Sequence, residues 1–408
     1  MVIGRILAPI FLLPALLFGA LFFDSDSNRE AEIVRAFDLP PAFLNDPKLQ
    51  KIISKKRTEY QRHGFFKSLN QAYLFIPMIK DILVHSDVPD EFLFLAMAES
   101  GFSIDAYSHK KASGVWQFMP ETGRTFGLQI NDYVDERRDL VKSTKAAITY
   151  LETLHARFNK WYLAAIAYNC GEGRLYRAIK KAGTDNISVL LDEKKRYLPR
   201  ESRNYIRKIV ALTLLASDED FMINQEYAYL LNRANAYSIA QVKVSRGERI
   251  SRVAKLINMP AYKLTSLNPH LKYDFVPPKN TQYTIYIPYV KLNEFRQNYK
   301  PAPLETFYML HHVEAGDNLS RIGKKYRVPY KMIKEFNRLH TNMLRIGQKL
   351  VIPLSKPLDL KNGKYTVKRG DSLEAIARIF ETTVSSLKKL NNIKGSLIRV
   401  GDRLSIYD

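Results

Sequence analysis

A single acidic residue, Glu99, ends a run of residues that is otherwise apolar, Phe92 to Ala98. Pro89 and Gly101 suit the start and the end of a helix around this run. At the C-terminal end of a buried helix, partial desolvation and the negative end of the helix dipole both disfavour a carboxylate, so the pKa of Glu99 is expected to rise. Glu99 is therefore a candidate proton donor for cleavage of a glycosidic bond. A surface glutamate, or a buried one paired with arginine, is the alternative that this pattern leaves open.

Other groups that could take part in chemistry are less clear. Conventional glycosidases pair two carboxyl groups, and the candidates for a second one are Asp105, Glu121 and Glu136. The only cysteine, Cys170, has no recognisable base partner, so we expect a small buried side chain. A disulfide within the chain and a cysteine-built metal site are excluded. The eight histidines are scattered without a matching pair, so we predict no metal site and no cofactor.

The elements that position Glu99 are predicted to be helices. Residues from about 30 to 230 show helical periodicity with few candidate strands. Because Phe92 to Ala98 are apolar on every side, their helix should be the buried one of its domain. With 408 residues and 46% hydrophobic content, the chain can bury several domain cores, and a disordered protein is excluded.

Three segments of the C-terminal half repeat one another. Residues 244–268, 313–337 and 367–391 align without gaps, and each is followed by a closing strand that comes four residues later in the first repeat than in the others. Each repeat indicates a strand, two helices and a strand within about 45 residues. The Pro-rich and polar stretches 298–306 and 354–364 predict linkers, so we expect modules on short tethers.

Most of the positive charge lies in this repeated half. The formal net charge is +22, and residues 241–408 hold 31 Lys and Arg against 13 Asp and Glu. Such an excess favours an anionic polymer, such as a cell wall with free carboxylates, or anionic lipid as the partner. No nucleic acid is expected, because the basic and aromatic residues form no recognisable reading motif.

The N-terminus is typical of an export signal. One basic residue, Arg5, precedes an uncharged run from Ile6 to Phe23, which a polar stretch follows. Phe18 and Ala20 make a poor cleavage site, and the uncleaved run is long enough to anchor the chain in a membrane. The run contains no cysteine for lipid modification, since the only one is Cys170.

The repeats resemble the LysM module. Its motif, Y-x-V-x-x-G-D-[ST]-L, is nearly complete from Tyr365 to Leu373 and close from His311 to Leu319, whereas the first repeat departs from it at Glu248, Arg249 and Ile250. The resemblance implies binding of glycan that contains N-acetylglucosamine. By position, the implied ligand residues are Gly316, Asp317, Asn318, Leu319, Asn337, Ile346, Gly370, Asp371, Ser372, Leu373, Asn391 and Ile398. Several of these residue types also serve turns, helix caps and cores, so structural roles are the alternative.

Four motifs follow "ESGF" in order: "SGVWQFM", "DERRD", "AYNCGEGR" and "LPRESRNY". This set resembles the catalytic domain of the lytic murein transglycosylases related to goose-type lysozyme, and the LysM modules resemble those of the membrane-bound branch of that family. The resemblance implies that Glu99 is the acid/base. It also implies sugar contacts by Ser113, Gln117 and Met119, contacts of Tyr168 and Asn169 with Glu99 and the substrate's N-acetyl group, and places for Glu201 and Tyr205 near the cleft. Cys170 departs from the alanine usual there.

The resemblance implies a reaction that needs one carboxyl group. Glu99 would protonate the leaving oxygen and then take a proton from the C6 hydroxyl of N-acetylmuramic acid, which closes onto C1 and gives a 1,6-anhydro product. The substrate supplies its own nucleophile, and water takes no part. A muramidase that uses water on the same scaffold and a non-catalytic peptidoglycan-binding protein are the alternatives.

We therefore predict an all-α, lysozyme-like (goose-type/SLT) catalytic domain followed by small α+β LysM repeats of βααβ order. The expected parts are 1–23 signal peptide or membrane anchor, 24–84 helical segment, 85–235 transglycosylase domain, 241–290 degenerate LysM-like repeat, and LysM repeats 308–354 and 364–408. The expected partners are peptidoglycan glycan strands and a cell wall or anionic membrane surface. The expected location is the periplasm or cell envelope, and the sequence predicts no oligomeric state.

Overall fold

The computed structural model describes residues 26–131, 133–222, 239–277, 282–301, 307–326, 328–337, 339–354, 360–361, 364–367, 371–379, 383–393 and 395–406. The chain forms two compact units. The first comprises Met1–Val242, Tyr262–Tyr273 and Tyr286–Glu294, and the second comprises Lys243–Ala261, Asp274–Ile285 and Phe295–Asp408. The expected signal or anchor at 1–23 and most of both expected linkers lie outside the described residues. In the part of the chain that is described, no helix has the length and apolar character needed to cross a membrane.

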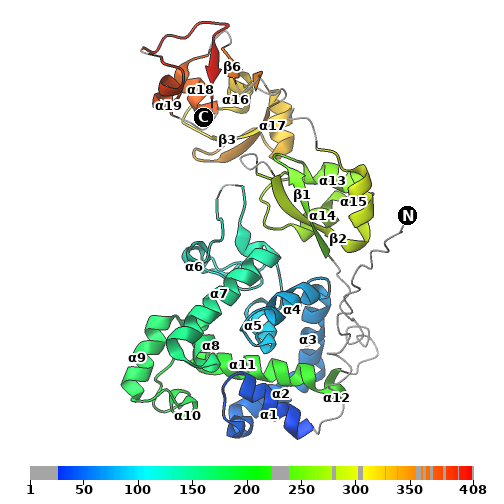
Figure 1. Ribbon diagram of the computed structural model, residues 1–408, viewed down its shortest axis with the longest axis vertical. Coiled ribbons are helices and arrows are strands. Elements are labelled where there is room, and N and C mark those ends of the chain that lie inside the picture. The colour runs from blue at the N-terminus through cyan, green and yellow to red at the C-terminus, as the bar shows by residue number, and fades with distance from the viewer. Residues whose placement is uncertain are drawn as a thin grey trace, which may run out of the picture. The chain divides into compact units, whose positions relative to one another are not determined.

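The first unit is built mainly from helices (Figure 1). In chain order they are α1 (Asp26–Ala36), α2 (Pro47–Arg57), α3 (Glu59–Ala72), α4 (Ile76–Val84), α5 (Leu93–Ser100), α6 (Pro120–Thr125), α7 (Leu140–Phe158), α8 (Trp161–Cys170), α9 (Glu172–Ala182), α10 (Ile187–Leu190), α11 (Arg200–Ser217) and α12 (Glu219–Met222). Short 3-10 turns lie at η1 (Pro41–Asn45), η2 (Asp90–Phe92) and η3 (Glu136–Arg138).

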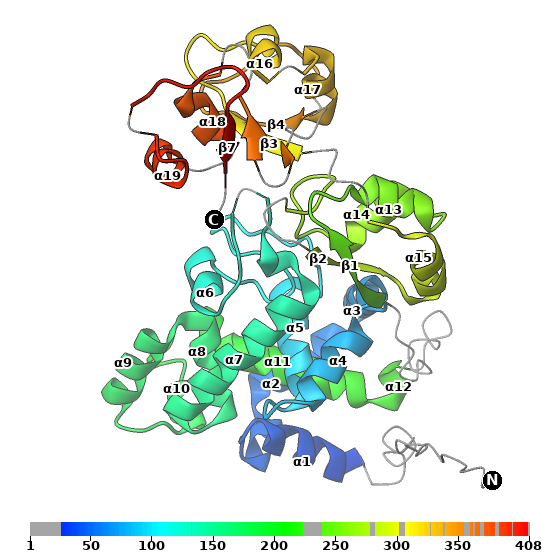
Figure 2. The same ribbon diagram turned by 45° about the horizontal axis from the view of Figure 1, so that its top comes forward.

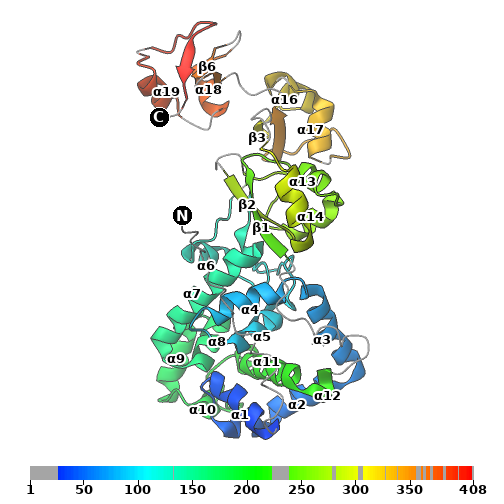
Figure 3. The ribbon, with the colours of Figure 1, turned by 45° about the vertical axis from the view of Figure 1, so that its right-hand side comes forward.

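Helix α11 is the central element of this unit. It packs against α2, α5 and α8, and α7 packs against α8 and α4. In Figures 1 and 3, α11 runs between α1 and α2 on one side and α5 and α8 on the other. An ion pair between Arg207 of α11 and Asp46, the N-cap of α2, adds to the apolar contacts (Nη2 to Oδ2, 2.8 Å). The N-terminal helices are thus part of the same packed body as the predicted catalytic helices.

Helix α5 is the buried helix that the sequence predicts. Leu93, Leu95, Ala96, Met97 and Ala98 are all buried. Gly101 ends the helix in the left-handed region, at φ 61°, where a residue without a side chain is favoured. The 3-10 turn η2 precedes α5 directly, so the regular helix begins at Leu93, four residues after Pro89.

The C-terminal repeats have the predicted strand, helix, helix, strand order. The first contains β1 (Ile239–Ser245), α13 (Ile250–Leu256), α14 (Ala261–Leu267) and β2 (Gln282–Pro288), followed by η5 (Tyr289–Lys291) and α15 (Leu292–Asn298). The second contains β3 (Phe307–His312), α16 (Leu319–Tyr326), α17 (Tyr330–Phe336) and β4 (Lys349–Leu354). The third contains β5 (Leu360–Lys361), β6 (Lys364–Thr366), α18 (Leu373–Ile379), α19 (Val384–Leu390) and β7 (Arg403–Ser405).

Each repeat has a small sheet with its two helices packed on one side. Strands β3 and β4 pair antiparallel from Phe307 opposite Leu354 to His312 opposite Lys349, with α16 and α17 on one side of them (Figure 2). Their shared core contains Leu319, Ile322 and Leu350. The third repeat buries Leu373, Leu387 and Leu404 in the same way, over a sheet of order β5, β6, β7. The leucine of the repeat motif is therefore a core residue in both.

Candidate active site

Glu99 lies on the last turn of α5, with α11 and α8 beside it. The Tyr205 hydroxyl of α11 donates a hydrogen bond to Glu99 Oε1. Burial raises the pKa of Glu99, the Tyr205 hydrogen bond and the nearby Lys208 ammonium oppose the rise, and the Glu201 carboxylate adds to it. The net direction is upward, so Glu99 keeps its proton at a higher pH than an ordinary glutamic acid does. The carboxyl group is thus held by a donor and favoured in its protonated form.

Two tyrosines form the polar wall beside Glu99. Burial, followed by the Glu99 charge, raises the pKa of Tyr205 and of Tyr168 well above the usual range, so both stay neutral. The Tyr168 hydroxyl donates instead to the main-chain carbonyl of Trp116 at 2.7 Å. The hydrogen bond to the Glu99 carboxyl group comes from Tyr205 of α11.

The loop "SGVWQFM", residues 113–119, is fixed to α5 and α7. Ser100, next to Glu99, donates to the Val115 carbonyl at 2.8 Å. The fully buried Trp116 donates its indole N–H to Thr144 Oγ1 of α7 at 2.9 Å. Gly114 has φ +81°, and a Cβ there would lie 1.8 Å from the Arg137 carbonyl oxygen, so only glycine fits. These contacts place the loop directly beside the candidate acid.

The predicted sugar-contact residues of this loop differ in accessibility. Ser113 is completely buried, and its hydroxyl accepts a hydrogen bond from Arg138 Nε at 3.0 Å. Gln117 is half-buried, adopts φ 48°, and bonds to the Gly114 carbonyl through Nε2 at 2.8 Å. Met119 is 44% exposed. Gln117 and Met119 are therefore accessible to a ligand, whereas the Ser113 side chain belongs to the support of the loop.

The segment "DERRD", residues 135–139, also holds this loop in place through hydrogen bonds of Arg137 and Arg138. Arg137 binds Asp135 through two parallel bonds of 2.8 and 2.7 Å, and its Nη1 donates to the carbonyls of Lys111 and Phe118 at 2.6 and 2.9 Å. Glu136 is buried and paired with Lys142. A buried Glu136 with a cationic partner is a structural residue rather than a second acid. The other two candidates, Asp105 and Glu121, are exposed.

Asn169 and Cys170 end helix α8 at the other side of the site. Ser202 of α11 donates its hydroxyl to Asn169 Oδ1 at 2.8 Å, which leaves the amide nitrogen as the group that can donate to a ligand. Burial raises the pKa of the Cys170 thiol, so the nucleophilic thiolate is disfavoured. Within the described residues no group of three His, Cys, Asp or Glu is placed to hold a metal ion.

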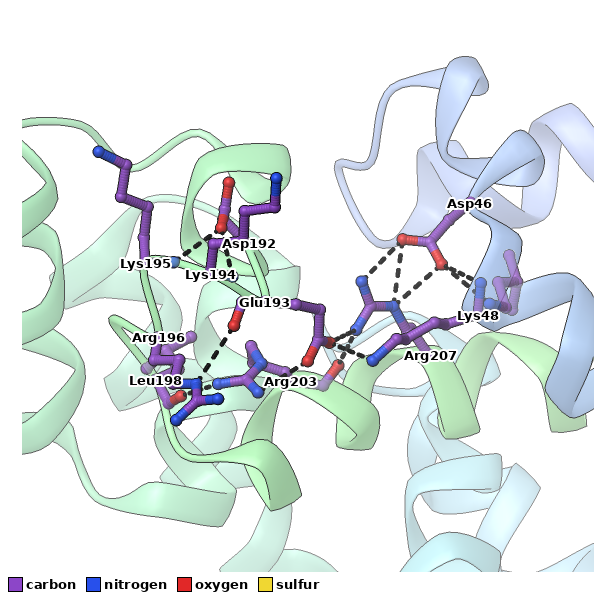
Figure 4. Close-up of polar contacts among 11 residues, drawn as sticks. Asp46, Lys48, Asp192, Glu193, Lys194, Lys195, Arg196, Leu198, Arg203 and Arg207 are labelled. Atoms are coloured by element: carbon purple, nitrogen blue, oxygen red, sulfur yellow. Dashed lines mark hydrogen bonds and ion pairs between the residues drawn. The ribbon is translucent and has the colours of Figure 1, made fainter.

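An ion-pair cluster holds the start of α11 (Figure 4). The same part of α11 carries Glu201, Ser202 and Tyr205. The centre of the cluster is Glu193, which pairs with Lys48 at 2.7 Å and with Arg203 at 2.9 Å. These two partners lower the pKa of Glu193 to about 2. A basic cavity of about 840 Å³ lies beside the cluster and is lined by Lys48, Arg174, Glu193, Arg196, Tyr197, Leu198, Pro199, Arg200 and Arg203.

Comparison with known proteins shows family models that match parts of the chain. Residues 78–191 match the family described as Transglycosylase SLT domain, residues 311–353 and 365–406 match the LysM domain, and residues 238–303 match the Lytic transglycosylase MltD, LysM-like domain. The chain carries a transglycosylase SLT domain and LysM modules. This content indicates a lytic transglycosylase.

The chain is also similar to individual proteins. The membrane-bound lytic murein transglycosylase D of Escherichia coli K12 is 27% identical over 394 residues, which is 90% of this chain and 85% of that protein. A putative tributyltin chloride resistance protein of Alteromonas is 46% identical over 94 residues, 23% of this chain and 45% of that protein. The solved structure of the 70 kDa soluble lytic transglycosylase SLT70 of Escherichia coli matches 50% of this chain and 37% of its own, with 19% identity and a TM-score of 0.32.

The LysM motif residues mostly serve the modules themselves. Asp317 bonds to His311 and to the Glu314 N–H, and Asn318 and Ser372 cap the helices that follow them. The Asn391 side chain donates to the Ser405 carbonyl and accepts from the Ser405 N–H. By contrast, the Ile346 side chain is 76% exposed and Ile398 is half-buried. Leu319 and Leu373 lie in the cores, and Gly316 forms a turn at φ +85°. The Asp371 carboxylate accepts a hydrogen bond from the Tyr365 hydroxyl, and the Asn337 side chain bonds to the main chain of Val351. Gly370 lies outside the described residues.

Several residues that support the site were not predicted from the sequence. Lys208 donates to the Ala98 carbonyl and acts on the Glu99 charge, and Ser202 orients Asn169. The helical spacing in "ESRNYIRK" could have indicated both residues, because Ser202, Tyr205 and Lys208 are three residues apart on one face of α11. Thr144 carries no such signal, since only the fold brings it to Trp116.

Proposed function

We propose that the chain cleaves the β-1,4 bond between N-acetylmuramic acid and N-acetylglucosamine in peptidoglycan, with Glu99 as its single acid/base. The observation that carries the proposal is the setting of Glu99, which lies half-buried at the end of α5, accepts a hydrogen bond from Tyr205 and has a raised pKa. General acid catalysis by such a group supplies roughly 10²- to 10⁴-fold in rate.

The hydrogen bond from Tyr205 occupies one oxygen of the Glu99 carboxyl group. Because Tyr205 donates to Oε1, we assign the acidic proton to Oε2. Oε2 gives this proton to the glycosidic oxygen as the bond from C1 to that oxygen breaks. The resulting carboxylate is stabilised by Tyr205 and Lys208. It then takes the proton of the C6 hydroxyl as O6 bonds to C1, which gives the 1,6-anhydro end and restores the acid without water.

Three accessible groups are proposed to bind the sugar. The amide nitrogen of Asn169 is free to donate to the N-acetyl carbonyl, because Ser202 occupies its oxygen. Gln117 and Met119 belong to the loop beside Glu99 and are accessible. Ser113, Tyr168 and Tyr205 are proposed to act through the groups they hold, and the exposed Glu201 through its charge near Glu99.

The second and third repeats are proposed to retain the enzyme on peptidoglycan. Exposed apolar side chains such as Ile346 offer contact to sugar rings, and two weak sites on one chain raise retention through effective concentration. The basic charge of residues 241–408 favours a polymer with free carboxylates or an anionic membrane surface. We place the protein in the cell envelope, with 1–23 as its signal or anchor, in line with the relative named membrane-bound.

Digestion of purified peptidoglycan by the wild type and by Glu99→Gln, read by mass spectrometry, tests the reaction. The expected wild-type product ends in the anhydro sugar, which is lighter by one water than the muramidase product, and the variant should yield almost none. A hydrated end would favour the muramidase. Equal product from both proteins would overturn the role of Glu99, and wall binding without any product from the wild type would favour a non-catalytic protein.

A further inference from the structure

The three repeats share one asparagine that bonds to the last strand in the same way, and it aligns them residue by residue. Asn268 bonds to the carbonyl and the N–H of Tyr286 at 2.8 Å each. Asn337 makes the same pair with Val351, and Asn391 makes it with Ser405. Tyr286, Val351 and Ser405 are therefore equivalent positions. The separations are 18, 14 and 14 residues, so the first repeat has four extra residues in the loop between its second helix and its last strand.

That longer loop folds over the loop after β1 in the first repeat. The Ile250 N–H donates to the Asp274 carbonyl at 3.2 Å, and the Val276 N–H donates to the Glu248 carbonyl at 3.0 Å. Ser251 Oγ bonds to the Asp274 carboxylate at 2.6 Å. Phe275 and Val276 are fully buried there. The space between the two loops, where the LysM resemblance puts glycan, is occupied by the chain itself.

The equivalent loops of the other two repeats are open. Met343 and Ile346 of the second repeat are 84% and 76% exposed. Leu397 and Val400 of the third repeat are 78% and 67% exposed. Exposed apolar side chains on a small module are suited to ligand contact, and a buried loop is not. The first repeat therefore has a different task from the other two.

The first half of the long loop belongs to the compact unit that contains the catalytic helices. The Asp135 N–H donates to the His270 carbonyl at 2.8 Å, and the Lys272 N–H donates to the Tyr133 carbonyl at 2.9 Å. The His270 ring is completely buried, with Nε2 3.9 Å from Asp139 Oδ2. Burial lowers the pKa of His270 to about 4, so the ring is neutral at neutral pH.

Tyr286 reaches the same carboxylate. Its hydroxyl donates to Asp139 Oδ1, and both side chains are buried. Asp139 is the N-cap of α7 and accepts from the Lys142 N–H at 3.0 Å. In the first turns of α7, Thr144 accepts from the Trp116 indole, and the Trp116 carbonyl accepts from Tyr168 beside Glu99. A continuous set of short contacts thus connects Tyr286 with the wall of the site.

We propose that the first repeat is a positioning element of the transglycosylase domain and not a glycan binder, with Tyr286 acting through Asp139 to hold α7 and the Trp116–Tyr168 wall beside Glu99. The equivalent positions, Val351 and Ser405, have no phenol to offer, which fits repeats that carry out retention instead. This inference relies on the proposed role of Glu99.

The test compares two tyrosine variants of the full chain. Tyr286→Phe removes the hydroxyl that bonds to Asp139. Tyr299→Phe is the matched control, because it removes a hydroxyl of the same repeat that bonds to the Ser245 N–H and to Glu248 rather than to Asp139. With small soluble glycan fragments, Tyr286→Phe should lower kcat about 10-fold with little change in KM, because a small displacement of the site costs rate rather than binding. Tyr299→Phe should leave kcat within about twofold of the wild type.

The pH profile separates positioning from a general loss of folded protein. The groups that face Glu99 are Tyr205, Lys208 and Glu201 from α11 and Tyr168 from α8. If the wall loosens, water reaches Glu99 and its raised pKa falls, so the basic limb of kcat should move to lower pH in Tyr286→Phe. A smaller folded fraction would lower kcat at every pH without moving the limb.

Quenching of tryptophan fluorescence gives a readout that does not depend on activity. Trp116 is one of two tryptophans in the chain and is completely buried. Its fluorescence should become more accessible to a water-soluble quencher in Tyr286→Phe than in Tyr299→Phe. Equal kcat, pH limb and quenching in the two variants would overturn the inference. Wild-type activity of Glu99→Gln would instead overturn the proposed function, so the two failures are distinguishable.

Discussion

The transglycosylase domain and the second and third repeats use their motif residues differently. In the domain, many residues outside the motifs also form the core, so Glu99 can lie on the last turn of a buried helix with a raised pKa and Met119 can be exposed. In a repeat of about 45 residues, the motif residues Asp317 and Leu319 must form the turn and the core. A motif match therefore identifies chemistry in the large domain, whereas in the small repeats it identifies mainly the fold.

The largest expected effect separates the two regions completely. Glu99→Gln should lower the rate of glycan cleavage by roughly 10²- to 10⁴-fold, because the only proposed proton donor is lost. Retention on insoluble peptidoglycan should be unchanged, since the repeats are untouched. Cleavage is measured by release of soluble fragments, and retention by sedimentation with purified wall. Loss of retention in this variant would mean that the cleft, and not the repeats, holds the protein on the wall.

Deletion of residues 308–408 should give the opposite result. Retention on insoluble wall should fall at least 10-fold, because the two open repeats act together. Cleavage of small soluble fragments should stay within about twofold of the full chain, since the first repeat and its contact with Asp139 are kept. Sedimentation and fragment release measure the two quantities. Undiminished retention would mean that the first repeat binds glycan, contrary to its closed loop.

Two substitutions in the second repeat separate its fold from its binding. Asn337→Ala should lower the stability of that repeat by about 1 to 3 kcal/mol, because partly buried backbone groups of Val351 lose their partner. Ile346→Ala changes an exposed side chain, so stability should change by no more than about 0.5 kcal/mol while retention falls. Thermal unfolding and sedimentation are compared in a Glu99→Gln background, which leaves the wall intact. Normal retention of Ile346→Ala would exclude this side chain from the glycan contact.

The sequence predicts the elements well and their contacts only in part. The helical half, the buried α5 and the strand order of the repeats follow from periodicity, and the place of Glu99 follows from one apolar run. That Tyr205 rather than Tyr168 donates to Glu99 could not be read from the sequence, because both hydroxyls are plausible until the packing of α8 and α11 is known. The closed loop of the first repeat is visible in the sequence only as four extra residues.

The smallest expected effect concerns the stability of the transglycosylase domain. The folded-state pKa of Glu99 lies above its ordinary value of 4.5, mainly because of burial. A group of this kind contributes stability that is fully present below the unfolded pKa and is lost as pH rises through the folded pKa, since the folded state then has to bury a charge.

The amide introduced by Glu99→Gln would keep an oxygen for the Tyr205 hydroxyl and carry no charge at any pH. At pH 8, this variant should therefore have a Tm higher by about 2 to 4 °C, as a change of 1 kcal/mol gives in a domain of this size. Below pH 4.5 the two proteins should melt at the same temperature. A variant that melts lower than the wild type at pH 8 would show that the Glu99 carboxylate is stabilised by its surroundings, and a site of that kind would not favour the protonated acid that the reaction requires.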